Sequence, residues 1–415
     1  MSKAKNNIIN GPARIGDGLP KGWEWKKLEE VCYINPPKSE SKPLGNIEVS
    51  FLPMADLKEK QMLFKPLQKK LLNEVYSGYT YFINNDVLLA KVTPCFENGK
   101  SGIAKNLVNG VGFGSSEYYI LRPIKALPEY IYHIISNPCF LKEGKENMSG
   151  AVGLQRVKKE FLYNYKIPLP PLPEQQRIVK KLDTLFERID KAIQLTRENG
   201  EHSKHLLPAA LNEVFGEAEE KGWKIKQLKA ICKIIGGGTP SKQNTSYYKN
   251  GTIYWASVRD MNVEIIEDTE LKIAENAVKD SATNIIPKGN IVIATRVGLG
   301  KVCKLKYDTS INQDLKGIVP NKEISIDYLF FWFKSIANYI IENGIGATVK
   351  GVRLDFINAL EVPLPDLPAQ QRIVNYLNQL SAKQQQLQQH YSKQLQQLQA
   401  LKASLLDAAF RGELA

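Results

Sequence analysis

The sequence predicts an α/β protein that contains the same module twice, a globular α/β domain followed by a long helix. The first observation is a repeat: PLPPLPEQQRIVKKL at 168–182 returns as PLPDLPAQQRIVNYL at 363–377, with eleven identical positions at a constant offset of 195 residues. The second observation is that each repeat follows a segment of domain length, 19–167 and 217–362, in which short apolar runs alternate with polar loops.

The composition agrees with this arrangement. The chain has 415 residues, more than one hydrophobic core usually serves, so two or three domains are expected. Hydrophobic residues make up 43% of the chain and charged residues 24%, which is ordinary for a globular protein. The formal net charge of +13, with a pI near 9.2, favours a polyanionic partner such as nucleic acid over a merely basic surface.

Residues 1–18 are predicted to form a polar leader, because they lack the apolar segment of a secretory signal. The most apolar run, YLFFWF at 328–333, is too short to span a bilayer. We therefore expect a cytoplasmic protein without a membrane partner. Neither a disulfide framework nor a metal site is expected, because no CxxC pair occurs among the cysteines Cys32, Cys95, Cys139, Cys232 and Cys303.

The two globular domains open with matching tryptophans, Trp23 and Trp223. The runs NDVLLAK at 85–91 and GNIVIAT at 289–295 each predict a buried strand. Polar or glycine-rich loops follow in both domains, at 93–102, 114–117 and 150–157 in the first and at 296–301, 311–314 and 346–353 in the second. Apolar strands that carry three such loops predict an α/β scaffold whose loops recognise a ligand.

The basic and amide side chains of these loops and their surroundings are the candidates for DNA binding. Arg and Gln or Asn can hydrogen-bond bidentately to guanine and adenine edges, whereas Lys mainly neutralises phosphate. Each such residue alone is more often a solvated charge, and only their clustering carries the prediction. The candidates are Lys91, Asn98, Lys100, Gln155, Arg156 and Lys158 in the first domain, and Arg259, Arg296, Asn312, Gln313, Lys350 and Arg353 in the second.

Segments 168–216 and 363–415 each predict a stiff proline-rich arm that leads into a helix. A continuous helix over 173–215 would be roughly 64 Å long. Because one such helix alone would leave its apolar seam exposed, the two are predicted to pack as a coiled coil, with packing of each helix on its own domain as the alternative. Gly200 and Pro208 are expected to fray or kink the first helix. The predicted seam residues are Ile178, Leu182, Leu185 and Ile189 in the first helix, and Ile373, Leu377, Leu380, Leu387 and Leu398 in the second.

Two short runs resemble motifs of catalytic proteins, but each lacks a residue that the motif needs for its function. Asn35-Pro36-Pro37 resembles an amino-methyltransferase signature, but Lys38 stands where an aromatic residue must stack on the target base. The run that ends in Gly99-Lys100-Ser101 resembles a phosphate-binding loop, but Pro94 replaces its first glycine. No catalytic residue is therefore predicted.

The duplicated arm and helix resemble the conserved regions of the specificity subunit of type I restriction-modification enzymes. Two further stretches, KVTPCFENGK at 91–100 and GGGTPSKQNTSYYKNGTIYWASVRDM at 236–261, look like target recognition domain segments of that family. The resemblance covers nearly the whole chain after the leader. It implies two tandem α/β target recognition domains that each read half of a split, asymmetric DNA sequence, with the two helices forming an antiparallel spacer.

The resemblance also implies the partners. These are double-stranded DNA, two modification subunits that bind S-adenosylmethionine and methylate adenine N6, and restriction subunits that cleave. The chain itself is expected to bind no cofactor. The alternative is a coiled-coil assembly scaffold whose basic domains bind nucleic acid without sequence preference. A self-sufficient DNA methyltransferase is disfavoured because the cofactor and catalytic motifs are missing.

Overall fold

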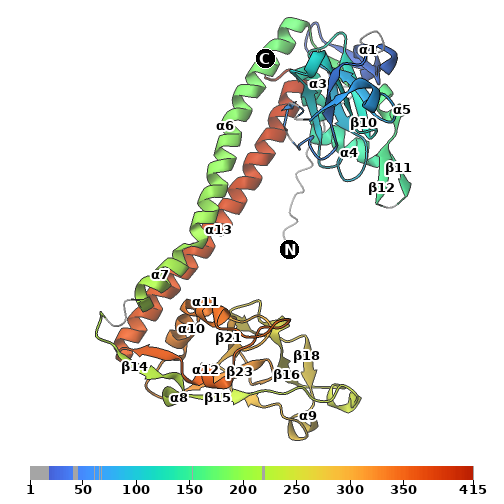
Figure 1. Cartoon of the computed structure of the whole chain (residues 1–415). Helices are drawn as coiled ribbons and strands as arrows, with labels where there is room; N and C mark the ends of the chain where they lie inside the picture. The colour runs from blue at the N-terminus through green and yellow to red at the C-terminus, as the bar shows by residue number, and fades with distance from the viewer. Residues whose placement is uncertain are drawn as a thin grey trace. The chain divides into compact units, whose positions relative to one another are not determined.

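The computed structural model describes residues 18–40, 45–59, 61–64, 66, 68–151, 153–216 and 220–414 (Figure 1). The predicted leader at 1–18 lies outside the described residues, except for Gly18. The chain divides into two compact units, the first made of residues 1–196 with 393–415 and the second of residues 197–392. Each unit therefore combines one globular domain with parts of two helices that are distant in sequence.

In the first unit two sheets form the centre of the domain (Figure 1). One has the strand order β2 (Cys32–Ile34), β10 (Tyr118–Pro123), β7 (Val87–Ala90), β8 (Ser101–Ala104) and β4 (Leu63–Phe64). The other has the order β5 (Gln68–Leu71), β3 (Glu48–Leu52), β9 (Val111–Gly114) and β6 (Thr80–Ile83). Neighbouring strands are antiparallel, except for the parallel pairs β4–β8 and β3–β9.

Two strand pairs and a set of helices complete this domain. β1 (Glu24–Lys27) pairs with β13 (Lys166–Leu169), so the proline-rich arm starts as a strand of the domain. β11 (Met148–Ala151) and β12 (Leu154–Val157) form a hairpin that projects from it (Figure 1). The helices are α1 (Leu28–Val31), α2 (Leu72–Val75), α3 (Pro128–Ile135), α4 (Pro138–Glu146) and α5 (Lys159–Asn164).

The strand predicted within 85–91 is β7, and all of its residues are buried. Side chains alternate along a strand. Accordingly, Val87 and Leu89 join a core that includes Ile131 of α3, whereas Leu88 joins a core with Phe82 of β6. Burial on both faces explains why this strand is a continuous apolar run.

The second unit repeats this topology. One sheet has the order β15 (Cys232–Gly236), β23 (Leu315–Pro320), β20 (Ile291–Ala294), β21 (Val302–Leu305) and β17 (Ile265–Ile266). The other has the order β18 (Leu271–Ile273), β16 (Ile253–Ala256), β22 (Thr309–Ile311) and β19 (Ile285–Ile286), and β14 (Lys224–Gln227) pairs with β24 (Glu361–Leu364). The pairs β17–β21 and β16–β22 are parallel, at the positions equivalent to those in the first unit. The helices are α8 (Leu228–Ile231), α9 (Glu275–Lys279), α10 (Ile326–Ser335), α11 (Ala337–Glu342) and α12 (Leu354–Asn358).

The long helices are α6 (Leu172–Lys204), α7 (Leu206–Gly216) and α13 (Leu367–Phe410). The helical segment over 173–215 is interrupted at His205, between Gly200 and Pro208, the two residues expected to fray or kink it. Pro208 has no N–H group to donate to the carbonyl of Lys204, four residues earlier. Instead, Nε2 of Gln384 on α13 donates to that carbonyl at 3.0 Å. Gly200 remains helical.

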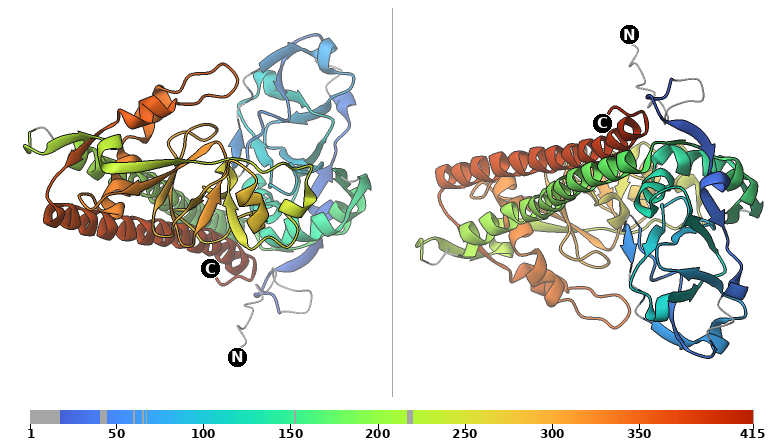
Figure 2. Two further views of the ribbon diagram at one scale, coloured as in Figure 1. Left: turned by 90° about the horizontal axis from the view of Figure 1, so that it is seen from below. Right: turned by 90° about the horizontal axis from the view of Figure 1, so that it is seen from above.

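Within each unit the helices run antiparallel and lie side by side (Figure 2). In the first unit Nζ of Lys402 forms an ion pair with Asp190 at 2.8 Å. In the second unit Gln384 bonds to Lys204, so higher numbers in one helix meet lower numbers in the other. The antiparallel coiled coil is therefore confirmed. Of the predicted seam residues, Ile178, Leu182, Ile189 and Leu377 are buried and Leu185, Ile373, Leu380, Leu387 and Leu398 are half-buried.

The helix ends also belong to the domain cores. In the first unit Ile178 and Leu182 share a core with Phe410, which packs edge-on against the ring of Tyr130 at 5.6 Å. In the second unit the ring of Phe215 lies 5.4 Å from that of Tyr328. Each domain core is thus completed by the start of the helix that follows it and by the end of the other long helical segment.

None of the helices in the described part of the chain combines the length and apolar character needed to cross a membrane. All five cysteines are described, and they form no disulfide.

Candidate nucleic-acid interface

The predicted loops meet where β7 and β20 end. In the first domain the amide of Lys91 donates to the carbonyl of Glu117, and the amide of Val157 donates to the carbonyl of Lys91, both at 2.9 Å. In the second domain Thr295 takes the place of Lys91: its amide donates to the carbonyl of Asp314 at 2.8 Å, and its carbonyl accepts from Val352 at 2.9 Å. Backbone hydrogen bonds thus join the three loops in the same way in both domains.

The hairpin of the first domain is bound tightly to the loop that follows β7. The amide of Thr93 donates to the carbonyl of Gln155, and the amide of Gln155 donates to Oγ1 of Thr93, each at 3.0 Å. Gly150 has a φ of +130°, and a Cβ there would lie 2.6 Å from the carbonyl oxygen of Leu154. Gly346 has a φ of +140° at the equivalent point of the second domain. Only glycine suits this conformation, which explains the glycine that opens both loops.

Arg156 and Glu117 form a doubly hydrogen-bonded ion pair in the first loop cluster. Nε and Nη2 of Arg156 donate to the two carboxylate oxygens of Glu117 at 2.9 and 2.8 Å. The hydrogen bonds from Arg156 lower the pKa of Glu117, so this carboxylate stays charged at neutral pH. Beside it, Nζ of Lys91 donates to the carbonyl of Ser116 at 2.8 Å.

Two of the remaining candidates of the first domain, Asn98 and Lys100, form hydrogen bonds within the domain. Nδ2 of Asn98 donates to Glu59 at 2.8 Å, and Nζ of the half-buried Lys100 donates to the carbonyl of Met54 at 3.3 Å. Both side chains thus tie the loop to the segment before β4. Lys158, in contrast, is exposed at the start of α5.

In the second domain the cluster centres on Asp314. Nη1 of Arg296 lies 3.7 Å from its Oδ1, and Nδ2 of the buried Asn312 donates to its Oδ2 at 3.3 Å. Gln313 also donates to Asp314, at 3.4 Å, and accepts a hydrogen bond from the hydroxyl of Thr239. The carboxylate therefore organises the polar side chains of this loop.

The other candidates of the second domain lie around this cluster. Lys350 and Arg353 are exposed, and Arg353 precedes the first residue of α12. Arg259 forms an exposed ion pair with Glu270 at 3.3 Å. It adjoins the loop that contains Arg296, because a Cβ on Gly298 would lie 2.8 Å from Cγ1 of Val258.

Sequence reasoning missed the two acidic residues, Glu117 and Asp314. The signal was present, because the equivalent tetrapeptides GSSE at 114–117 and INQD at 311–314 both end in an acid. It also missed the close packing of the GGG segment at 236–238. A Cβ on Gly237 would lie 2.2 Å from the carbonyl oxygen of Asn312, so this segment supports the 311–314 loop directly.

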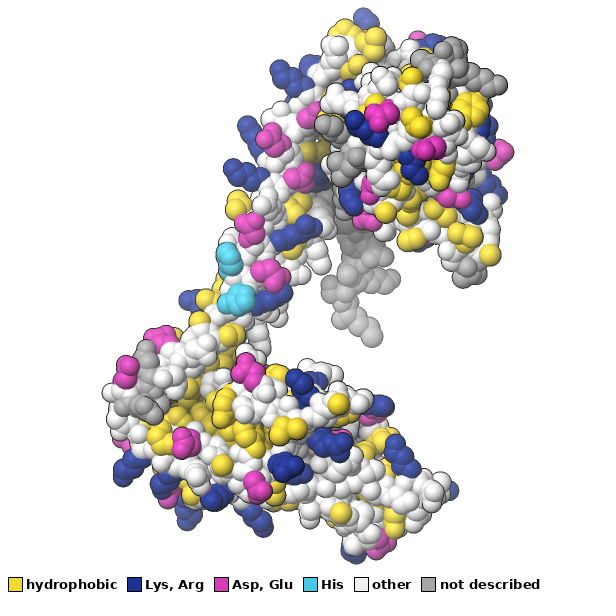
Figure 3. Space-filling view, viewed as in Figure 1, with side chains coloured by type: hydrophobic (Ala, Val, Ile, Leu, Met, Phe, Trp, Pro, Cys, Tyr) yellow, Lys and Arg dark blue, Asp and Glu magenta, His cyan; other side chains and the backbone are white. Residues whose placement is uncertain are grey.

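Basic side chains are spread over both domains and along the helices, with acidic side chains among them (Figure 3). The positive charge of the chain is therefore dispersed on the face shown, and local clusters such as those above decide where a polyanion can bind.

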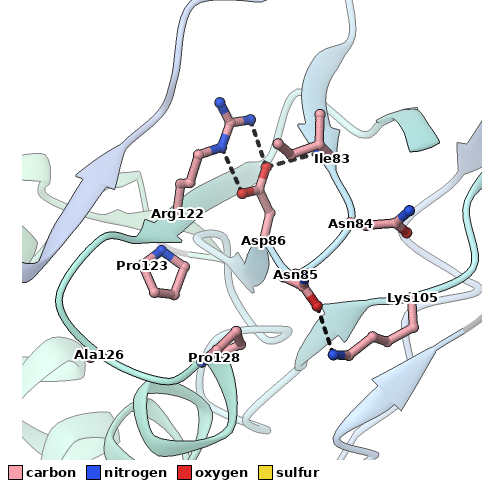
Figure 4. Close-up of a pocket in the computed structure, with 9 residues that line it drawn as sticks. All are labelled: Ile83, Asn84, Asn85, Asp86, Lys105, Arg122, Pro123, Ala126 and Pro128. Carbon is pink, nitrogen blue, oxygen red and sulfur yellow. Dashed lines mark hydrogen bonds and ion pairs between the residues drawn. The ribbon is translucent and has the colours of Figure 1, made fainter. Parts of the chain in front are cut away.

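A separate polar pocket of about 480 Å³ lies in the first domain (Figure 4). The buried Asp86 accepts two hydrogen bonds from Arg122, at 2.8 and 2.9 Å, and one from the amide of Ile83 at 2.8 Å. Burial raises the pKa of Asp86 despite these partners. Nζ of Lys105 donates to Asn85 at 2.6 Å. These charged and polar groups hydrogen-bond to one another, so we assign the pocket a structural role.

A family model for the type I restriction modification DNA specificity domain matches the chain twice, at residues 20–198 and 220–397. The EcoAI specificity subunit of Escherichia coli is 38% identical over 175 residues, which cover 42% of this chain and 29% of that protein. The EcoR124I/EcoR124II specificity subunit of Escherichia coli is 28% identical over 274 residues, which cover 61% of this chain and 63% of that protein. The matched part therefore spans less than two thirds of either relative.

Two solved structures share the fold. The HsdS subunit from Thermoanaerobacter tengcongensis has a TM-score of 0.67 at 22% identity, over 95% of this chain and 98% of that chain. A chain from work on complex assembly and conformational transition of the type I R-M system has a TM-score of 0.79 at 23% identity, over 95% of this chain and 99% of that chain.

Proposed function

The chain belongs to the family of type I restriction modification DNA specificity domains, and from this premise we propose that it is the specificity subunit of a type I restriction-modification system. In this role it reads a bipartite target in double-stranded DNA. Two modification subunits then methylate adenine with bound S-adenosylmethionine, and restriction subunits cleave. The chain itself performs no catalysis, binds no cofactor and acts in the cytoplasm.

One observation carries this proposal. The family model matches once in each half of the chain, and each half builds the same three-loop cluster from different side chains. Arg156 and Gln155 occupy positions in the first cluster at which the second has Gly351 and Lys350. Two clusters of one geometry and different chemistry suit the reading of two different half-sites.

The alternative is a coiled-coil scaffold whose domains bind nucleic acid without sequence preference. Dispersed charge, as in Figure 3, is compatible with that role. Sequence preference separates the two proposals.

The test is methylome sequencing of a methylation-free bacterial host. The host expresses the modification subunit of the same system, with or without this chain. We expect methylated adenines in one split motif, and only when the chain is present. Methylation that is absent in both cultures, or that follows no motif, would contradict the proposed function.

A further inference from the structure

We propose that each domain reads a guanine with an arginine that a carboxylate holds in place, Arg156 held by Glu117 in the first domain and Arg296 held by Asp314 in the second. This inference rests on the proposed function. It adds the identity of a base in each half-site and gives the two acidic residues a positioning role.

The two carboxylates occupy equivalent positions. Glu117 directly precedes β10, in which Tyr118 pairs with Ala90 of β7. Asp314 directly precedes β23, in which Leu315 pairs with Ala294 of β20. The backbone carbonyl of Glu117 accepts a hydrogen bond from the amide of Lys91, the residue after β7. The carbonyl of Asp314 likewise accepts one from the amide of Thr295, the residue after β20.

The two arginines, in contrast, lie on opposite sides of an equivalent β-bridge in the two domains. In the first domain Val92 pairs with Arg156, and in the second Arg296 pairs with Gly351. Arg156 thus stands on the hairpin side and Arg296 on the loop side. A Cβ on Gly351 would lie 2.8 Å from Cγ of Arg296, so the arginine uses the space that a side chain at 351 would need. Both domains therefore place a guanidinium beside a carboxylate at an equivalent position, although the two arginines come from different strands.

A purely structural role does not explain this recurrence. In the first domain the ion pair ties the hairpin to the 114–117 loop. In the second domain the amides of Thr295 and Arg296 already bond to the carbonyl of Asp314, at 2.8 and 3.4 Å. The ion pair of Arg296 there joins segments that the backbone has already joined. What the two domains share is the position of the guanidinium.

In the first domain the geometry leaves a hydrogen-bonding edge of the arginine available, whereas in the second domain Nη1 of Arg296 lies 3.7 Å from Asp314 in an ion pair without a side-chain hydrogen bond. Glu117 takes Nε and Nη2 of Arg156, and the edge formed by Nη1 and Nη2 is left to face a ligand. That edge matches O6 and N7 of guanine. The side chains of Arg156 and Arg296 are 43% and 56% exposed, so a base can reach them. A guanidinium that is already held in place loses less conformational freedom on binding.

The charge of the pair favours a base over a phosphate. The carboxylate largely cancels the positive charge of the arginine and repels a phosphate oxygen that approaches the same site. A guanine edge carries no net charge, so only its hydrogen bonds matter. Lys158, which is exposed directly after the hairpin, forms no ion pair with a carboxylate among the described residues and suits a phosphate better.

The test uses the full chain with its modification subunits and the methylated motif found for the proposed function. Duplexes carry 7-deazaguanine, which lacks N7, at one guanine at a time. With the unaltered protein we expect one guanine in each half-site at which this change lowers affinity about 10- to 150-fold, the range for a hydrogen bond to a charged group. In Arg156→Gln that sensitivity should disappear in one half-site only, and in Arg296→Gln in the other.

Glu117→Gln tests positioning. We expect it to relax methylation at the same base pair as Arg156→Gln, whereas Lys158→Gln, which removes a charge nearby, should lower methylation of all sites alike. The proposal is overturned if no guanine is sensitive in the unaltered protein, or if Arg156→Gln lowers thermal stability and leaves the motif unchanged. In both cases a split motif would still be methylated, so the proposed function would stand.

Discussion

At the scale of single residues, the loop clusters separate side chains that face a ligand from side chains that hold the loop. Lys100 and Asn98 bond to Met54 and Glu59 within their own domain, whereas Lys158 is exposed. We therefore expect the exposed group to contact DNA and the internally bonded groups to act on loop geometry. Two predictions belong to this scale.

Lys158→Ala should weaken the binding of every DNA duplex alike. A lysine that contacts phosphate releases about one counterion, so the slope of log affinity against log salt should become less negative by about one. Affinity measured over a salt series tests this. Lys383→Ala, which removes an exposed lysine of α13, is the matched control and should leave the slope unchanged. A loss confined to one sequence would show that Lys158 reads a base.

The Arg156–Glu117 pair should make stability depend on pH in a defined direction. The pKa of Glu117 is lowered in the folded state, chiefly by the hydrogen bonds from Arg156. The stabilisation is therefore present above the ordinary glutamate pKa of about 4.3 and is lost as the pH falls through the lowered value. Thermal unfolding of the unaltered chain and of Glu117→Gln should differ at pH 7 and converge in acid. A constant difference would assign the effect to something other than this charge.

At the scale of elements, each long helix is fixed to its domain by a buried glutamine. Nε2 of Gln175 donates to the carbonyl of Pro170, and its Oε1 accepts from the amide of Leu127, both at 2.9 Å. In the second unit Gln370 bonds in the same way to Pro365 and to the amide of Ser325, at 2.9 and 2.8 Å. The QQR shared by the two copies of the repeat thus contains one residue that joins arm, domain and helix.

Gln175→Ala should lower the free energy of unfolding by about 1 to 3 kcal/mol, because it leaves a part-buried amide and a buried carbonyl without a partner. Denaturant unfolding measures this, with Gln370→Ala as the equivalent change in the second unit. The neighbouring Gln176 is exposed, and Gln176→Ala should change the free energy by less than about 0.5 kcal/mol. Equal effects at 175 and 176 would contradict the bonding role.

At the scale of the whole molecule, the first compact unit joins two distant stretches of chain, residues 1–196 and 393–415, whereas the second is the continuous stretch 197–392. Phe410, close to the end of α13, completes the core of the first domain, and Phe215 at the end of α7 completes that of the second. The stability of each domain therefore depends on a residue that lies outside the domain in sequence and belongs to a long helix.

Phe410→Ala should destabilise the first domain by about 3 to 5 kcal/mol, the range for a buried phenylalanine. Hydrogen exchange resolved along the sequence should show faster exchange in β7 and α3 than in the unaltered chain, while β20 and α10 stay protected. Phe215→Ala should give the reverse pattern. Faster exchange only near the end of α13 would mean that this helix end frays without affecting the domain.

Exchange of residues 217–362 for the corresponding segment of a related chain should change one half of the methylated motif and leave the other half intact. The reason is that each domain has its own loop cluster and its own core. Methylome sequencing decides the matter. If both halves change, the assignment of one half-site to each domain is wrong.

The sequence by itself determined the elements that depend on nearby residues. The period of the apolar positions predicted β7, β20 and the long helices, and the repeat required the same topology in both domains. Those features are local or are copied, so periodicity and alignment reveal them. The sequence also placed the loops that meet at the ends of β7 and β20.

Only the tertiary structure decided which distant groups meet. It paired Arg156 with Glu117 and Arg296 with Asp314, turned Lys100 inward, and supplied Gln384 to the carbonyl that Pro208 leaves without a donor. It also placed Phe410 in the core of the first domain and not in that of the domain it follows. The physical reason is that side chains far apart in sequence are brought together by the packing of whole elements. The two copies of the helix have the same apolar periodicity, so the periodicity does not reveal which domain core the end of each helix completes.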